Sequence, residues 1–447
     1  MCRDMTRAVW ANWICIATES SMSIRRTDTP MTNRTLRLKE TVIASFCEPA
    51  REVAALLREF SASDWQKVQF WLDASGVALY LLDRLTTLKL QHLLPENLLT
   101  RLQENLRTNR DRTNALFEEA VAINHALQQK GIQFALLKGA TLTPDSVPDN
   151  TLRTQWDLDF LVAEKDAEDT LQVLQDFGYS LFAVSGMTWE LKAGTSGLPG
   201  IANIYKVQPY RSLEVHLLPA QHNGTGNIRQ DQLTRARMRT IRGEALRSLS
   251  PADLFMQQAL HLFKHICGEY TRASWVLEYW RHVSARYDDK AFWREVKSLA
   301  DDEPQADVAI GAVTLLTTHL FGEFAPLELT DWSMRRLPSA IRLWVETYGC
   351  RAVMSEFPGS KLYLLLRQQL QAQKKSERGH LRGLIFPAHL PPKITHGKSN
   401  NGLLSRLMQY RAQANFIFVR LRFHVVEGLR YSVESPRWQR RLTGMTQ

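Results

Sequence analysis

Apolar residues in the first third of the chain recur at three- and four-residue spacings, which is the period of amphipathic helices. Val53, Leu56 and Phe60 illustrate this spacing, and it continues as far as Gly131. Glycine readily adopts the left-handed conformation that ends a helix, so the last of these helices is predicted to stop there. The pattern therefore predicts a helical N-terminal region over residues 39–130.

The pattern changes after Gly131 into short apolar runs without a helical period, which indicate buried strands. One helix, Lys165–Phe177, is expected to end before Gly178. Residues 131–245 are therefore predicted to form a small mixed sheet with helices packed against it. Strands are expected at Ile132–Leu137, Trp156–Val162, Ile204–Val207 and Leu213–Leu218, of which the last two would form a hairpin.

Helices are predicted again from Ser250 onward. Serine at the cap, Pro251 at the first helical position and Asp253 at the third are typical of a helix start. We expect a helical region over residues 246–330 that packs on the sheet, and a basic helical region over residues 331–447. Together these segments predict an α+β protein whose small mixed sheet lies between helical N- and C-terminal extensions.

The N-terminal segment lacks apolar periodicity. Residues 18–38 are polar, so residues 1–38 are predicted to form a flexible leader. The apolar stretch Ala8–Ala17 faintly resembles a signal peptide, and a natural start at Met22 or Met31 is the alternative. The five cysteines stand far apart and never as Cys-x-x-Cys. This spacing argues against a disulfide framework or a zinc knuckle and favours a cytoplasmic protein.

The net charge of +10 is concentrated at one end of the chain. Residues 331–447 hold 20 Lys and Arg against 6 Asp and Glu, whereas residues 1–330 hold 36 against 40. Such a basic region attracts anionic partners, either nucleic acid or a lipid surface. Its last segment, Leu403–Tyr431, mixes arginine with large apolar residues, and packing on the protein itself is the alternative. No apolar run reaches the roughly 18 residues that a membrane span needs.

Two acidic residues interrupt the strand predicted over Trp156–Val162. Side chains alternate between the faces of a strand, so Asp157 and Asp159 are predicted to share one face, opposite Leu158 and Phe160. Two neighbouring carboxylates repel each other unless a cation lies between them. Hard divalent cations such as Mg²⁺ prefer oxygen ligands of this kind.

A third carboxylate stands in the strand predicted over Leu213–Leu218. Glu214 shares a face with His216 there, and it joins the two aspartates if the strands pair. Three acids on adjacent strands are the minimum for a two-metal site. An Asp-x-Asp pair alone is weak evidence, because a solvated strand face would have the same sequence. The order of the surrounding motifs favours the metal site.

The order of motifs over residues 75–290 resembles the uncharacterised nucleotidyltransferase family of the DNA polymerase beta superfamily. A helical lead-in precedes a strand that ends in Leu-Lys-Gly, then an arginine, Asp-Leu-Asp-Phe-Leu-Val, Gly-Tyr, Glu-Val-His and a helix with spaced histidines. These six motifs stand in the family's order at Leu137–Gly139, Arg153, Asp157–Val162, Gly178-Tyr179, Glu214–His216, and His261 with Lys264-His265.

The resemblance implies a polymerase-beta-like nucleotidyltransferase fold and the transfer of a nucleoside monophosphate from an NTP to a hydroxyl-bearing acceptor. It implies that Asp157, Asp159 and Glu214 bind Mg²⁺, with Mn²⁺ as an alternative, and that Glu214 could also act as the base. The chain departs from the superfamily at Lys138-Gly139, where Gly-Ser or Gly-Gly is usual. How the triphosphate is bound, and which acceptor is used, are therefore left open.

Four residues around the acids are predicted to contact the nucleotide: Lys138, Gly139, Arg153 and His216. Lysine would act as a point charge and arginine as a fork on phosphate oxygens. Each side chain has a structural alternative, because Lys138 could be solvated, Arg153 could pair with an acid, and His216 could be a structural histidine. Trp156 stands directly before the acids, where a small or polar residue is expected.

Other features near the predicted sheet have weaker functional interpretations. His261 and His265 stand four apart, a spacing that can bind zinc, but packing is preferred because no third ligand is evident. The glycine-rich segment Gly194–Gly200 is expected to be a mobile loop near the site that could act as a lid. Pro144 and Pro148 leave little room for a long helix after the first strand.

Two functions therefore compete on the same fold. The preferred one is a Mg²⁺-dependent nucleotidyltransferase. The alternative is a non-catalytic protein that senses nucleotides while its basic C-terminal region binds nucleic acid or membrane. Three intact carboxylates, Asp157, Asp159 and Glu214, favour the enzyme, because a decayed site would usually have lost one of them.

Overall fold

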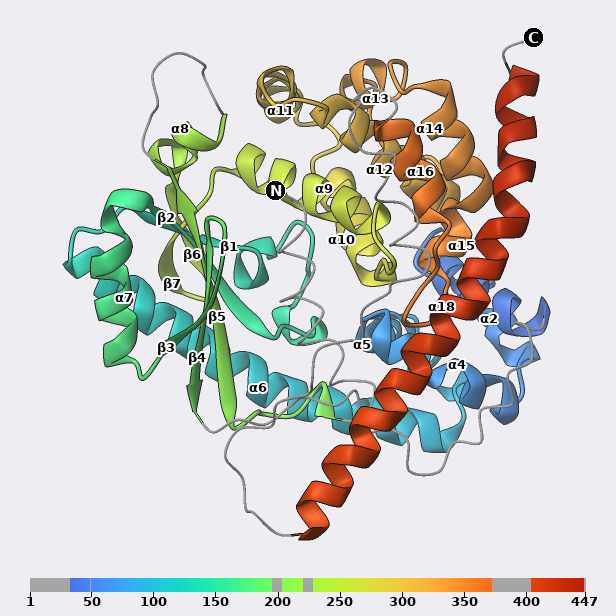
Figure 1. Ribbon diagram of the computed structural model, residues 1–447, viewed down its shortest axis with the longest axis horizontal. Helices are drawn as coiled ribbons and strands as arrows, with labels where there is room; N and C mark the ends of the chain where they lie inside the picture. Colours follow the sequence, from blue (N-terminus) through green and yellow to red (C-terminus); the bar gives the residue numbers. More distant parts are fainter. Residues whose placement is uncertain (1–32, 49, 195–202, 220–227, 372–402, 446–447) are drawn as a thin grey trace.

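The computed structural model describes residues 33–48, 50–194, 203–219, 228–371 and 403–445. Within these ranges a single mixed sheet has the strand order β3-β4-β5-β2-β1-β7-β6. Helices surround it and account for most of the remaining chain, which confirms the predicted α+β class (Figure 1). The strands are β1 (Phe134–Leu137), β2 (Asp157–Ala163), β3 (Ser180–Ser185), β4 (Thr188–Gly194), β5 (Tyr210–Leu218), β6 (Arg237–Ile241) and β7 (Glu244–Ser248).

Strand β2 lies at the centre of the sheet. It pairs with β1 in antiparallel and with β5 in parallel, and β4 pairs in antiparallel with the far side of β5. The predicted hairpin of Ile204–Val207 with Leu213–Leu218 is therefore wrong, because the partners of β5 are β2 and β4. Ile204 and Tyr205 are buried in a turn against helices rather than in the sheet. A short apolar run is buried both in such a turn and in a strand, so the sequence could not distinguish the two.

The two faces of the sheet are covered by different helices. Leu158, Phe160 and Val162 of β2 join a core with α6 (Glu96–Gln129) and α7 (Ala167–Asp176). Residues on the other face of the sheet, Leu137 and Leu161 among them, belong to a larger core built with the remaining helices. Both sheet cores follow from the period-two alternation of apolar residues.

The N-terminal helices pack together as the apolar spacing predicts. Figure 1 shows α6 running from them to the sheet. Gly131, at φ +69°, follows the end of α6 as predicted. One boundary is wrong: residues 33–38 were expected in the leader but begin the first of these helices, whereas residues 1–32 lie outside the described ranges. The helices are α2 (Asn33–Ala44), α3 (Ala50–Ala55), α4 (Ala62–Ala74) and α5 (Ala78–Thr87).

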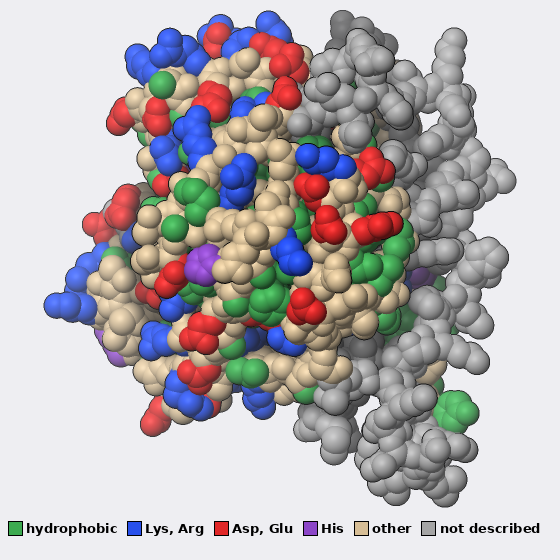
Figure 2. All heavy atoms as spheres, turned by 90° about the vertical axis from the view of Figure 1, so that its left-hand side faces the viewer, with side chains coloured by type: hydrophobic (Ala, Val, Ile, Leu, Met, Phe, Trp, Pro, Cys, Tyr) green, Lys and Arg blue, Asp and Glu red, His purple; other side chains and the backbone are tan. Residues whose placement is uncertain are grey.

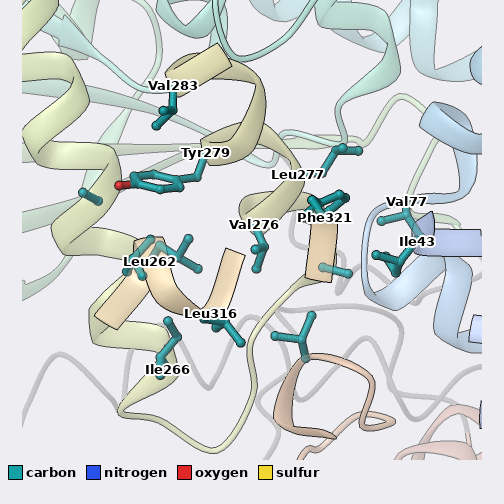
Figure 3. Packing of buried hydrophobic residues seen from close by; sticks show 14 of the residues in the cluster. Ile43, Val77, Leu262, Ile266, Val276, Leu277, Tyr279, Val283, Leu316 and Phe321 are labelled. Atoms are coloured by element: carbon teal, nitrogen blue, oxygen red, sulfur yellow. The ribbon is translucent and has the colours of Figure 1, made fainter. Parts of the chain in front are cut away.

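The helices after the sheet start where the sequence predicts. Ser250 caps α9 (Pro251–Ile266) by accepting a hydrogen bond from the Asp253 amide. Figure 3 shows apolar side chains of α9 and two later helices packed in one core, with Ile43 of α2 beside Val77 at one side of it. The later helices are α10 (Ala273–Ala285), α11 (Lys290–Asp302), α12 (Ala306–Phe321), α13 (Leu327–Ser333), α14 (Ser339–Trp344), α15 (Cys350–Val353) and α16 (Tyr363–Gln371).

A helix of 43 residues, α18 (Leu403–Met445), lies along one side of the molecule (Figure 1). It is longer than the predicted segment Leu403–Tyr431 and continues through Pro436. The extension packs on the protein, because Trp438 is fully buried and its ring lies 5.9 Å from that of Tyr348. Tertiary packing therefore outweighs the helix-breaking tendency of proline.

A buried lysine near the start of the described chain contacts a segment far along it. Lys39 of α2 has no solvent exposure, and its ammonium donates a hydrogen bond to the Met354 carbonyl at 3.1 Å. Its Nζ also lies 3.5 Å from Glu356 Oε1 and 5.2 Å from the centre of the Trp71 ring. Burial lowers the pKa of Lys39, and the Glu356 carboxylate opposes that effect. Residues 315 positions apart are thus held together in one contact.

The surface on the sheet side carries no single-sign field. Figure 2 shows Lys and Arg interspersed with Asp and Glu over this face. This mixture agrees with the near balance of charge in residues 1–330 and differs from the strongly basic C-terminal region. Among the described helices, none combines the length and the apolar character that a membrane-spanning helix requires.

Candidate active site

The predicted acidic residues come together on one face of the sheet. In the parallel pair of β2 and β5, Asp159 lies directly opposite Glu214, and Asp157 lies opposite Ser212. Asp157 and Asp159 project from the face opposite Leu158, as strand alternation requires. Asp159 is 2% exposed, while Asp157 and Glu214 are partly buried. The structure thus brings together Asp159 and Glu214, which lie 55 positions apart in the sequence.

A second pair of groups on this face is Asp159 and His216. His216 Nε2 lies 3.2 Å from Asp159 Oδ1 and 3.5 Å from Glu214 Oε2, and its Nδ1 lies 3.3 Å from the Thr188 hydroxyl. Among the described residues, Asp159, Glu214 and His216 form the group whose ligand atoms all lie within 4.8 Å of one another. Asp157, the fourth predicted residue, stands two positions before Asp159 and outside this close group.

Lys138 reaches the acids from the turn after β1. Its ammonium donates a hydrogen bond to Asp159 Oδ1 at 2.9 Å. The backbone there is unusual, because Lys138 has φ +47° and ψ −155°, a conformation that costs a non-glycine residue about 1–3 kcal/mol. Gly139 follows at φ +51°, and a Cβ on it would lie 2.3 Å from Gln155 Nε2. The turn therefore positions the Lys138 side chain beside Asp159, and its backbone favours glycine at the next position, Gly139.

Pro144 and Pro148 were predicted to leave little room for a long helix after the first strand, and the structure agrees. Only a short 3₁₀ turn, Gly139–Leu142, follows Lys138 within the described residues before Pro144. Lys138-Gly139 belongs to the Leu-Lys-Gly motif, and the wider superfamily usually has Gly-Ser or Gly-Gly there. In this chain the lysine side chain occupies the space beside Asp159.

Burial and mutual repulsion raise the pKa of two carboxyl groups. Burial and the charge of Asp159 raise the pKa of Asp157 to about 6. Burial and the charges of both aspartates raise the pKa of Glu214 to about 8. Burial acts in the same direction on Asp159, but the Lys138 ammonium and the His216 contact hold its pKa below the usual value. The Lys138 ammonium offsets part of this effect, because its charge lowers the pKa of all three carboxyl groups.

A fourth carboxylate adjoins this row and was missed by sequence reasoning. Glu190 of β4 lies directly opposite Glu214, and its side chain is 7% exposed. Its Oε1 lies 3.1 Å from the ammonium of Lys192, and its charge contributes to the raised pKa of Glu214. The alternation Trp189-Glu190-Leu191-Lys192 was the available signal, because Leu191 faces the core while the two charged residues face the site.

Trp156 has a structural explanation. The Arg112 guanidinium of α6 lies 4.3 Å from the centre of the Trp156 ring, and it donates a hydrogen bond to the Ile204 carbonyl. Burial lowers the pKa of Arg112 to about 10, while the charges of Tyr210 and Asp157 oppose that shift. Arg112 is therefore a cation close to the acids that the sequence pattern did not identify. Cation–π contacts of this kind also fix the bulky ring in place.

Arg153 adopts its structural alternative. Its Nε lies 3.2 Å from Glu278 Oε1 on α10, and the side chains are 15% and 2% exposed. Tyr80 also donates a hydrogen bond to Glu278. Arg153 and Glu278 nevertheless line a pocket that encloses about 380 Å³, its open mouth included. Lys138 lines the same pocket, so one side chain connects the acidic row to this space.

His261 and His265 pack against an aromatic ring. Their ring centres lie 4.5 Å apart, and Trp275 lies 5.2 Å from the first and 4.2 Å from the second. Neither belongs to the metal-ligating group found among the described residues. Burial is the main cause that lowers the pKa of His265 to about 3 and that of His261 well below its usual value. The packing interpretation fits these contacts better than a zinc site.

The neutral state of His265 predicts a loss of stability in mild acid. Its pKa is lower in the folded than in the unfolded chain, so stability present above pH 6.5 is lost as the pH falls toward 3. Between pH 6.5 and pH 5 the wild type should lose on the order of 2 kcal/mol more free energy of unfolding than His265→Gln. Urea titration followed by circular dichroism measures this difference. The exposed His92→Gln serves as control, and equal pH dependence in all three proteins would contradict the prediction.

The glycine-rich loop lies largely outside the described residues. Of the segment Gly194–Gly200 only Gly194 is described, as the last residue of β4 at φ +88°. A Cβ at Gly194 would lie 2.2 Å from the Pro209 carbonyl oxygen, so this glycine permits the close approach of β4 and the start of β5. The predicted lid role stays a prediction.

Similar proteins are found among solved structures and among protein families. An antigenic nucleotidyltransferase-like protein from Paracoccidioides brasiliensis is 15% identical, with 44% of this chain and 92% of that chain covered at a TM-score of 0.27. The antibiotic-resistance factor ANT(2'')-Ia is 10% identical, with 40% and 88% covered at a TM-score of 0.27. A search of curated proteins finds no match.

The family comparison extends the resemblance seen in the sequence motifs. The model of an uncharacterised nucleotidyltransferase family matches residues 61–322, which include every strand of the sheet and helices α4 to α12. The motifs had suggested residues 75–290, so the match is wider on both sides. Because it spans more than half of the chain, the protein belongs to the uncharacterised nucleotidyltransferase family.

Proposed function

We propose that the protein is a Mg²⁺-dependent nucleotidyltransferase that moves a nucleoside monophosphate from an NTP to a hydroxyl-bearing acceptor. The observation that carries this proposal is the row of carboxylates on β2 and β5, with Asp159 opposite Glu214 and Asp157 two positions before it. Family membership supports the reaction class, and the acidic row supplies the residues that such chemistry needs.

The donor set fits a hard divalent cation. Asp157, Asp159 and Glu214 offer carboxylate oxygens, the ligands that Mg²⁺ and Mn²⁺ accept most readily. Burial and the neighbouring carboxylates raise the pKa values of Asp157 and Glu214, and a bound cation would favour their ionised forms. These three residues would hold the metal, with His216 beside them. A bound metal would neutralise phosphate charge and lower the pKa of the attacking hydroxyl.

The remaining side chains have roles that follow from their positions. Lys138 already contacts Asp159, and its long side chain can turn to a phosphate oxygen when that carboxylate gains another partner. Glu214 would serve as the third metal-binding carboxylate. It would also accept the proton of the attacking hydroxyl. His216, between Asp159 and Glu214, orients both.

Two predicted nucleotide contacts have narrower roles than expected. Gly139 provides the backbone turn that presents Lys138, because its φ of +51° suits glycine. Arg153 is engaged by Glu278, so we assign it first to shaping the pocket beside Lys138.

Calorimetric titration of ATP, GTP, CTP and UTP, each with and without Mg²⁺, tests the proposal. Wild type should bind at least one NTP in a Mg²⁺-dependent manner, and Asp157→Ala/Asp159→Ala should lose that binding. The matched control is Asp169→Ala/Asp176→Ala, which removes two exposed aspartates of α7 and should bind as wild type does. Metal-independent binding that survives in the first variant would instead favour a non-catalytic nucleotide sensor.

A further inference from the structure

The long helix α18 has two faces of different character. Phe416, Phe423, Tyr431 and Trp438 recur at seven- and eight-residue spacings and are all buried against the protein. A second apolar series faces away from the protein and is 45% to 63% exposed. We call this second series the α18 outer stripe. It consists of Phe418, Leu421, Val425, Leu429 and Val433.

The outer stripe belongs to a firmly placed helix. Glu427 on the inner side accepts hydrogen bonds from the Ser360 hydroxyl at 2.8 Å and from the Lys361 amide at 3.1 Å. Arg420 Nη1 lies 3.1 Å from Glu269 Oε2. These contacts fix the rotation of α18 about its axis, so the apolar side chains of the stripe are held outward. Figure 1 shows the helix along the side of the molecule.

The charges around the stripe have one sign. Arg411 and Arg440 are exposed and stand seven residues before Phe418 and seven after Val433, which places them on the side of the stripe. The two acidic residues of α18 both point inward: Glu427 contacts Ser360, and Glu434 accepts a hydrogen bond from Tyr348 at 3.0 Å. The outward side of α18 is therefore apolar and basic, without a carboxylate from the helix itself.

We propose that the α18 outer stripe is a docking surface for an anionic lipid membrane, on which the helix lies parallel to the surface. Apolar side chains would enter the boundary between headgroups and acyl chains, while the arginines bind lipid phosphate and carboxylate groups. A second copy of this chain fits less well, because it would bring another region of net charge +14 against the first. RNA would leave the apolar stripe in water.

The proposal is tested with the full-length protein and vesicles in a sedimentation assay. The wild type should bind vesicles of equimolar phosphatidylcholine and phosphatidylserine and should bind pure phosphatidylcholine at least about tenfold more weakly. Leu421→Ser/Leu429→Ser should reduce binding to the anionic vesicles by at least about tenfold. Arg411→Gln/Arg440→Gln should weaken that binding as well, and high salt should weaken it in the wild type.

A matched control changes two exposed leucines elsewhere. Leu56→Ser/Leu327→Ser removes side chains that are 49% and 75% exposed outside α18, and it should bind vesicles as the wild type does. Circular dichroism and thermal unfolding establish that each variant is folded. Absence of vesicle binding by the wild type, or equal binding by all variants, overturns the proposal. A dimer that only Leu421→Ser/Leu429→Ser disrupts, without vesicle binding, assigns the stripe to a second copy; RNA binding without vesicle binding assigns the region to nucleic acid.

Discussion

Asp159→Asn should lower nucleotidyl transfer by at least about a thousandfold, which is the largest effect expected of any single substitution in the site. Asparagine keeps the size of the side chain but removes the negative charge that Lys138 and His216 contact and that would hold a metal together with Glu214. The residue is 2% exposed and central in the acidic row, so no other carboxylate can take its place. Pyrophosphate release from the NTP that binds in calorimetry measures the effect.

The control for this experiment is an aspartate of the same sheet region. Asp176→Asn changes an exposed residue at the end of α7 and should leave pyrophosphate release unchanged. Thermal unfolding of both variants shows whether activity is lost through the site or through the fold. Turnover near the wild-type rate in a folded Asp159→Asn protein would remove the acidic row from the mechanism.

Gly359→Ala should destabilise the protein by about 3–5 kcal/mol, a large value for one methyl group. Gly359 has φ +103°, and a Cβ there would lie 1.8 Å from the Glu269 carbonyl oxygen and 3.1 Å from Tyr270 Cα. The obstacle is backbone, which cannot move aside as a flexible side chain can. The next residue, Ser360, donates its amide to the same carbonyl at 2.8 Å, so the two segments must remain close.

A comparison with Gly322→Ala separates the cost of the backbone conformation from the cost of the steric clash. Gly322 has φ +80° after the end of α12, and a Cβ on it meets nothing within 4 Å. Only the backbone conformation, φ +80° and ψ −173°, opposes alanine there, so about 1–3 kcal/mol is expected. Urea unfolding of both variants gives the comparison. Similar losses of stability in Gly359→Ala and Gly322→Ala would mean that the backbone near Glu269 shifts to make room for the added methyl group.

The sequence was sufficient for the parts of the site that depend on local periodicity. Alternation along β2 placed Asp157 and Asp159 on one face, and the same rule placed Glu214 beside His216. The sequence left open whether these two strands pair, and the structure shows that they do. The ends of α6 and α7 could also be predicted from the sequence, because a helix end needs a residue that tolerates positive φ, and Gly131 and Gly178 supply it.

The features that the sequence did not predict depend on contacts between segments that are distant in the chain. Arg153 could have bound phosphate, and only the position of Glu278, 125 residues later, shows that it forms a buried ion pair. Ile204 suggested a strand because burial in a turn and burial in a sheet select the same side chains. The predicted segment ended at Tyr431, whereas the helix continues through Pro436 to the buried Trp438 and beyond. No local pattern contains this information.

The contact of Lys39 with Met354 also has a consequence for the order in which the protein matures. Helix α2 leaves the ribosome when the acceptor of its buried ammonium, 315 residues further along, has not been synthesised. Domains fold as their chain emerges, but this helix cannot complete its packing until nearly the whole protein is available. Protection of Lys39 from proteolysis on stalled nascent chains should therefore appear late, after the sheet has formed.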